Sequence, residues 1–141
     1  MSPTSILAPM FALAGLTFVV LSLIPFVRFR AAFAGRVGPA DFKLGESARV
    51  PADVAQINRN YMNLLEAPLL FYVACLTAYL TRSADQTMLT LAWFYVGLRA
   101  LHSVIHVSYN NVFHRLSAFA ASVVVLLVIW AHLFTRLFSA A

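Results

Sequence analysis

Residues 5–27 read SILAPMFALAGLTFVVLSLIPFV and contain no charged side chain. An α-helix needs about 20 apolar residues to cross the hydrocarbon of a bilayer, and this stretch is long enough. Helices and closed barrels are the structures that satisfy every backbone polar group in lipid, and an unbroken apolar run favours the helix. The stretch is also longer than the core of a signal peptide, so it predicts a retained transmembrane span.

The composition of the whole chain is typical of a membrane protein. Of its 141 residues, 62% are hydrophobic and only 11% are charged, whereas about a quarter of the residues of a soluble domain are charged. Further apolar segments follow the first, and we expect one domain, residues 1–141, with spans at about 5–27, 53–80, 87–108 and 113–138. The predicted fold class is an all-α membrane protein, a four-transmembrane-helix bundle.

Basic residues are distributed unevenly over the connections between the predicted spans. The first connection and its flanks contain Arg28, Arg30, Arg36, Lys43, Arg49 and Arg59, the third has Arg115, and the opposite side has Arg82 and Arg136. The positive-inside rule therefore predicts cytoplasmic first and third connections and outside termini. We expect a multi-pass cell membrane protein that is located in the inner membrane of a bacterium. A basic face for nucleic acid is not expected, because these residues are scattered.

Two of the predicted spans carry polar stripes near their cytoplasmic ends. Arg59, Asn63 and Glu66 share one helical face, and so do Arg99, His102 and His106, with Asn110 continuing the second stripe. Ionisable groups at membrane depth cost about 2.5–3.5 kcal/mol each, so they need partners. Glu66 and Arg99 could simply neutralise each other. Each stripe, however, has more hydrogen-bond donors and acceptors than the other stripe can pair with. The unpaired groups predict a ligand pocket between the two helices.

Arg115 stands close to the start of the fourth predicted span. A cation there opposes the helix dipole, which favours anions, so an anionic ligand beside it would be stabilising. The alternative is an interfacial arginine that extends towards water. Four candidate arginines, Arg28, Arg59, Arg99 and Arg115, stand against the single carboxylate of Glu66. Arginine forks bind carboxylates, so the set suits a ligand with several carboxylates and one amine.

Several segments resemble the membrane-associated proteins in eicosanoid and glutathione metabolism, the MAPEG superfamily, in its bacterial type. The segment RNYMNLLEAP at 59–68 resembles the second helix of that family. The segments RALHSVIH at 99–106 and RLSAF at 115–119 resemble its third helix and the start of its fourth, and VRFR at 27–30 resembles the end of its first. Three positions depart from the family pattern: Met62 replaces an arginine, Pro68 comes early, and His106 replaces a tyrosine.

The resemblance implies a homotrimer with glutathione, as co-substrate, bound between neighbouring subunits. By position, it implies that glutathione is bound by Arg28, Arg59, Asn63, Glu66, Arg99 and His102, with His106 and Tyr109 in the region of the family tyrosine. Arg115 matches the arginine near the sulfur and is the implied catalytic residue. A guanidinium at that place favours the reactive thiolate over the thiol. The implied enzyme is a glutathione transferase or peroxidase that acts on lipophilic electrophiles from the bilayer.

Other functions remain open on the sequence alone. A MAPEG-like protein without catalysis could use the same pocket to bind another anion or a lipid. His102 and His106 have a spacing that can share a metal or haem, but no acidic partner completes a zinc site, so no metal is expected. A small multidrug transporter would need a membrane carboxylate such as Glu66. The single cysteine, Cys75, lies in an apolar run and is expected to serve packing.

Overall fold

The computed structural model describes residues 3–139, and helices make up most of this part of the chain. The helices are α1 (Leu7–Phe33), α2 (Ala52–Leu65), α3 (Ala67–Leu80), α4 (Gln86–Val107) and α5 (Val112–Phe138), with short 3₁₀ turns at Pro3–Ile6 and Pro39–Phe42. Four helical stretches are long and apolar enough to cross a membrane, with α2 and α3 together forming one of them. The predicted fold class is therefore confirmed.

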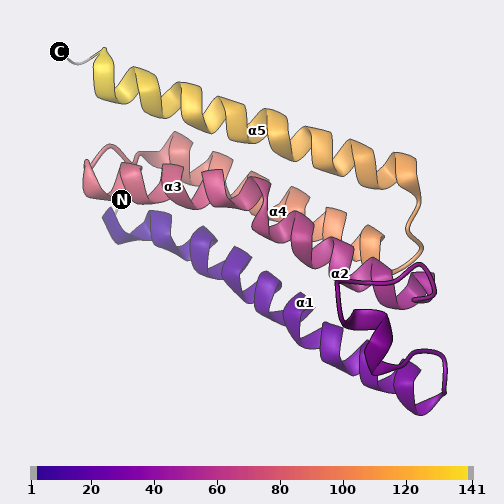
Figure 1. The fold of residues 1–141 in the computed structure, drawn as a ribbon. Coiled ribbons are helices and arrows are strands. Elements are labelled where there is room, and N and C mark those ends of the chain that lie inside the picture. The colour runs from indigo at the N-terminus through magenta and orange to yellow at the C-terminus, as the bar shows by residue number, and fades with distance from the viewer. Residues whose placement is uncertain (1–2, 140–141) are drawn as a thin grey trace.

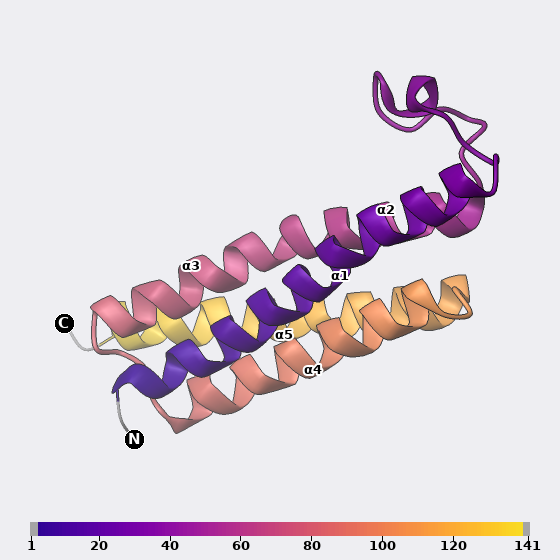
Figure 2. The same ribbon diagram turned by 90° about the horizontal axis from the view of Figure 1, so that it is seen from below.

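The helices lie side by side as an elongated bundle (Figures 1 and 2). The described ends of the chain lie at one end of the bundle, and the first and third connections lie at the other (Figure 1). Helix α5 packs along α4 and also contacts α3, while α1 packs against α2 and α4. This arrangement brings the loop before α2, the helix α2 itself and the turn between α4 and α5 to the same end of the bundle, opposite the described ends of the chain.

The interior of the bundle is apolar, and so is much of its outer surface. Leu13, Phe71 and Tyr95 are fully buried, with the rings of Phe71 and Tyr95 stacked at a centroid distance of 4.6 Å. Large side chains such as Phe11 and Phe134 instead point outward and are 75% and 62% exposed. Such exposure suits a chain whose surroundings are lipid tails rather than water.

The second predicted span, 53–80, is interrupted at Glu66, where α2 ends and α3 begins. Glu66 has φ −78° and ψ −89°, outside the helical range, and Pro68 is the second residue of α3. A proline has no N–H to donate to the carbonyl four residues earlier, and its ring clashes with that carbonyl. The span predicted at 53–80 is present as the stretch Ala52–Leu80, but the break in its helical geometry at Glu66 was not predicted.

The first helix is longer than the predicted span, because α1 continues beyond residue 27 to Phe33 and includes Arg28 and Arg30. Charged residues end the hydrocarbon-crossing part of a helix, but they do not end the helix itself, since arginine is a good helix former. The helix ends at Phe33, with Ala34 as its capping residue, and is followed by Gly35, whose φ of +67° suits glycine. The other predicted boundaries at 87–108 and 113–138 lie within one residue of α4 and α5.

At the end of the bundle that holds the described ends of the chain, Asp85 joins α4 to α5. Its carboxylate caps α4 by accepting a hydrogen bond from the Met88 amide at 2.8 Å. The same group lies 3.0 Å from His132 Nε2 and 3.7 Å from Arg136 Nε, both on α5. Burial opposes ionisation of this carboxylate, but these three partners outweigh it and hold the pKa of Asp85 below its ordinary value.

Candidate functional site

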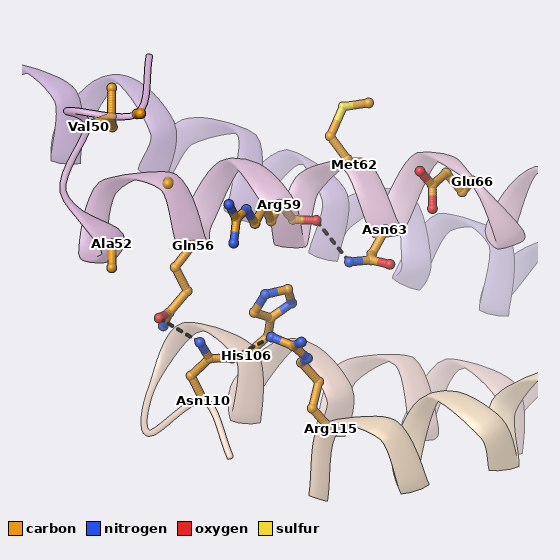
Figure 3. Close-up of a pocket in the computed structure, with 12 residues that line it drawn as sticks. Val50, Ala52, Gln56, Arg59, Met62, Asn63, Glu66, His106, Asn110 and Arg115 are labelled. Carbon is orange, nitrogen blue, oxygen red and sulfur yellow. Dashed lines mark hydrogen bonds between the residues drawn. The ribbon is translucent and has the colours of Figure 1, made fainter. Parts of the chain in front are cut away.

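A cavity of about 640 Å³ lies between α2 and the turn that joins α4 to α5 (Figure 3). Its walls are formed by Ala48, Val50, Ala52, Ala55, Gln56, Arg59, Met62, Asn63, Glu66, His106, Asn110 and Arg115. The lining thus combines charged and amide side chains from helices far apart in the sequence with small apolar residues of the first connection. A polar cavity in a membrane-embedded bundle marks a functional site.

One face of α2 supplies most of the polar lining. Arg59, Asn63 and Glu66 all line the cavity, as expected from their shared helical face. The side-chain amide of Asn63 donates to the carbonyl oxygen of Arg59 at 3.0 Å, which holds it against its own helix. The helix ends at Glu66, so this carboxylate lies at the break in the span. Figure 3 shows the three residues following one another along α2.

The turn between α4 and α5 positions Arg115. Asn110 has a φ of +48°, a left-handed conformation that asparagine tolerates well, and its N–H donates to the carbonyl of Ile105 at 2.8 Å. Asn111 then caps α5 by accepting from the amides of Phe113 and His114 at 3.0 and 3.1 Å. The chain therefore reverses within a few residues, and Arg115 falls in the first turn of α5.

The Asn110 side chain connects the two walls of the cavity (Figure 3). Its Nδ2 donates to Oε1 of Gln56 on α2 at 3.0 Å, and its Oδ1 accepts from Nη1 of Arg115 at 2.6 Å. The guanidinium of Arg115 is thereby held at the cavity, rather than extended towards water. A preoriented cation is what charge stabilisation in a site requires.

The charged groups of the cavity are not neutralised by one another. Within residues 3–139, Arg59, Arg115 and Glu66 take part in no ion pair. The cavity therefore holds two cations and one carboxylate, with Arg59 and Glu66 on the α2 wall and Arg115 on the opposite wall. An excess of positive charge in a confined site attracts an anion and binds it more strongly than open water would allow.

The second polar stripe is divided by the structure. His106 is almost fully buried and lines the cavity, whereas Arg99 and His102 are buried behind the lining. The Arg99 side chain donates to the backbone carbonyl of Asn63 beside the break, and forms no ion pair with Glu66. The Nδ1 of His102 donates to the carbonyl oxygen of Arg115 at 3.1 Å. These two residues thus support the helices that carry the cavity side chains.

Two other sequence candidates lie outside the cavity lining of this protomer. Arg28 bonds Glu46 at 3.1 Å, and its guanidinium carbon lies 4.5 Å from the ring centroid of Phe42. Tyr109 is 61% exposed, and its hydroxyl lies 3.1 Å from Nδ1 of His114. Tyr109 therefore does not line this cavity, and its part in ligand binding stays a prediction.

The sequence candidates did not include several residues of the cavity. Gln56 stands seven residues before Asn63, so the helical period of the stripe could have found it. Asn110 continued the second stripe, but its role in holding Arg115 depends on a turn conformation that spacing does not reveal. Ala48 and Val50 belong to an irregular loop, and no periodic signal exists for such residues.

The histidines do not assemble a metal centre in the described part of the chain. Among residues 3–139, no group of three or more His, Cys, Asp and Glu side chains is placed to hold a metal ion. The rings of His102 and His106 are 5.5 Å apart between centroids and nearly perpendicular. The Nδ1 of His102 is engaged by the carbonyl of Arg115.

The comparison with protein families identifies the family of the chain. The model described as MAPEG family matches residues 6–135, nearly the whole chain. No curated protein and no solved structure matches the chain.

Proposed function

Because the chain belongs to the MAPEG family over residues 6–135, we propose that its cavity binds glutathione and that the protein is a membrane glutathione transferase or peroxidase. The observation that supports this proposal is the cavity lined by Arg59, Arg115 and Glu66, none of which forms an ion pair in the described chain. Glutathione carries two carboxylates, one ammonium group and a thiol. Its charges complement those of the cavity.

The proposed roles follow from the chemistry of each side chain. Arg59 binds a carboxylate of glutathione through its guanidinium fork, and Glu66 binds the ammonium group. Asn63 and Gln56 supply amide groups for the peptide bonds of the ligand. Arg115, held by Asn110, lies beside the sulfur, and Arg99 and His102 act from behind by holding the backbone of Asn63 and Arg115.

The proposed catalysis depends on the thiolate. A free thiol has a pKa of about 8.5, so little of it is ionised at neutral pH. The nearby guanidinium of Arg115 stabilises the negative sulfur and thereby raises the population of the nucleophile. A lipophilic substrate that reaches the site from the bilayer is attacked by this sulfur. Attack at an electrophilic carbon forms a thioether and expels a leaving group or adds to a double bond. Attack at a peroxide oxygen breaks the O–O bond, releases an alcohol and leaves a sulfenic acid, which a second glutathione converts to the disulfide and water.

The homotrimer is part of the same proposal. Arg59 and Glu66 are exposed in the isolated protomer, although they belong to a stretch long and apolar enough to span a membrane. Contact between these charges and lipid tails would be costly. A neighbouring copy of the chain that covers this face would complete the wall of the cavity, and a closed ring of copies is the usual solution.

The membrane orientation is likewise proposed from the charge distribution. The first connection and its helical flanks carry most of the basic residues, and the connection lies at the same end as the cavity. By the positive-inside rule this end is cytoplasmic, and the termini are outside. The cavity would then open towards the cytoplasm, where glutathione is available, in the inner membrane of a bacterium.

Ultraviolet absorbance tests the proposed function directly, because a thiolate absorbs where a thiol does not. Addition of glutathione to the purified protein at neutral pH is expected to produce thiolate absorbance that saturates. S-methylglutathione, which has no thiol, is the matched control and should compete for the site without producing the signal. The absence of a thiolate signal at saturating glutathione would refute the enzyme assignment.

A second candidate function is supported by Met62. The resemblance implies an arginine at this position, but the methionine lines the cavity and removes one possible carboxylate contact. This observation favours a ligand with fewer negative groups, such as another anion or an acidic lipid, bound without catalysis. Failure of S-methylglutathione to bind, together with a missing thiolate signal, would favour this function over the first.

A further inference from the structure

A chain of two amide side chains crosses the cavity and ends on Arg115 (Figure 3). Arg115 donates through Nη1 to Oδ1 of Asn110 at 2.6 Å, and Asn110 donates through Nδ2 to Oε1 of Gln56 at 3.0 Å. Asn110 lies in the turn between α4 and α5, whereas Gln56 lies on α2, 54 residues earlier in the chain. The two walls of the cavity are therefore joined through one amide group.

The chemistry of the three groups permits only one direction for this chain. A guanidinium has donors and no acceptor, so the Asn110 atom that meets Arg115 must be its oxygen. The Asn110 nitrogen then points to the other wall, where it needs an acceptor. Gln56 supplies that acceptor and thereby favours the amide orientation that holds Arg115. Without it, a half turn of the Asn110 amide would present its nitrogen to the cation and release the guanidinium.

The turn and the helix that carry the two amides are held by other contacts. The backbone N–H of Asn110 donates to a carbonyl of α4 at 2.8 Å, and Asn111 caps α5, so the turn does not depend on the Asn110 side chain. Helix α2 is held against α4 by the hydrogen bond from Arg99 to the carbonyl of Asn63. Loss of the amide chain should therefore leave the bundle intact, and its effect should fall on Arg115.

We propose that Gln56 is a positioning residue, which orients the Asn110 amide and through it keeps the guanidinium of Arg115 at the sulfur of bound glutathione. This inference rests on the proposed function and extends the part of Gln56 from ligand binding to activation of the thiol. Hydrogen bonds in a chain polarise one another, so a bond at one end strengthens the bond at the other. Removal of the Gln56 oxygen should weaken the bond to Arg115, although the described chain has no direct hydrogen bond between these two residues.

The pKa of the thiol in bound glutathione tests the proposal, because it depends on Arg115 and not on affinity. It is measured by titrating the thiolate absorbance of the purified protein at saturating glutathione. Gln56→Met replaces the amide by an apolar side chain of similar length. Asn110→Gly deletes the amide at a φ of +48°, which glycine adopts readily. Each variant should raise the pKa of the bound thiol by about one, a roughly tenfold loss of thiolate at lower pH. Both variants retain the ionisable groups of the cavity, which are Arg59, Glu66, His106 and Arg115.

Three further variants separate positioning from a loss of binding. Asn63→Leu removes another amide of the α2 wall, one that is bonded to its own helix, so it should weaken glutathione binding and leave the pKa of the bound thiol unchanged. Because Gln56 acts through Asn110, the double variant Gln56→Met, Asn110→Gly should have the same thiol pKa as Asn110→Gly alone. Gln86→Met, the same substitution at the start of α4, should behave as the wild type. A wild-type thiol pKa in Gln56→Met, an equal rise in Asn63→Leu or an additive double variant would overturn the proposal.

A measurement without glutathione keeps this inference separate from the proposed function. Phenylglyoxal modifies guanidinium groups, and mass spectrometry of the peptides gives the rate at each arginine. Arg115 should react several times faster in Gln56→Met and in Asn110→Gly than in the wild type, whereas the exposed Arg82 should react equally in all three. Unchanged reactivity of Arg115 would overturn the positioning role. Faster modification in the variants, with no thiolate signal in the wild type, would support the positioning role and refute the proposed function.

Discussion

At the level of single residues, Arg115 is the side chain on which the proposed chemistry depends most. It is held at the cavity by Asn110 and lacks an acidic partner among the described residues. Arg115→Ala is expected to abolish the thiolate absorbance and to lower kcat by about 100-fold, the usual effect of losing one preoriented donor. Arg82→Ala, which removes an exposed cation from a distant turn, is the control for net charge. A full thiolate signal in Arg115→Ala would contradict this role.

Asp85 provides a pH-dependent test of stability, separate from the cavity. Its pKa is lower than the ordinary value of 3.8, because the Met88 amide, His132 and Arg136 outweigh the effect of burial. A carboxyl whose pKa is lowered by folding stabilises the fold when ionised, and this stabilisation is lost as the pH falls through the folded pKa. Asp85→Asn keeps an acceptor for the helix cap but removes the charge.

We expect Asp85→Asn to reduce the free energy of unfolding by about 1 kcal/mol at pH 7. The difference from the wild type should shrink as the pH falls below 3.8, the ordinary pKa of the group. Thermal unfolding of the detergent-solubilised proteins measures both effects. Asp53→Asn is the comparison, since Asp53 and its partner Arg36 are 63% and 41% exposed and should contribute little. A constant difference at all pH values would show that charge is not the cause.

Single residues also show where sequence reasoning succeeded and where it could not. The face shared by Arg59, Asn63 and Glu66 was predictable, because a helical period fixes which side chains lie together. The pairing of Arg28 with Glu46 was not, since the loop between them has no period. His106 and Arg99 lie on the same helical face, but only His106 lines the cavity, and Arg99 is buried behind the lining. Residue spacing alone could not predict this difference.

At the level of elements, the break between α2 and α3 sets the position of Glu66. A continuous helix would be restored most simply by Pro68→Ala, which supplies the missing N–H. The Glu66 carboxylate should then leave its present position, and glutathione affinity measured by calorimetry should fall about tenfold, as for loss of a charge-assisted hydrogen bond. Pro25→Ala, which replaces a proline of α1 away from the cavity, should bind glutathione as the wild type does. Unchanged affinity in Pro68→Ala would show that the break does not serve binding.

The elements themselves were the most predictable feature of the molecule. The boundaries predicted for α4 and α5 lie within one residue of the structure, because long apolar segments ended by polar turns leave little choice in a bilayer. The break at Glu66 was missed because Pro68 is compatible with both a kinked helix and an interrupted one. The length of α1 was underestimated because hydrophobicity shows where a helix leaves the membrane. It does not show where the backbone hydrogen bonds of the helix end.

At the level of the whole molecule, the cavity places Arg59 and Arg115 in the same protomer (Figure 3). In the proposed trimer, a neighbouring copy would cover the site without supplying either arginine. Co-assembly of Arg59→Ala subunits with Arg115→Ala subunits should therefore not restore activity, because no protomer of a mixed trimer has both side chains. Subunits tagged differently, purified in sequence and weighed by native mass spectrometry would establish that mixed trimers form. Wild-type subunits mixed with Arg115→Ala should retain activity in proportion to their share. Recovery in the mixture of the two variants would instead show that the arginines of one working site come from different subunits.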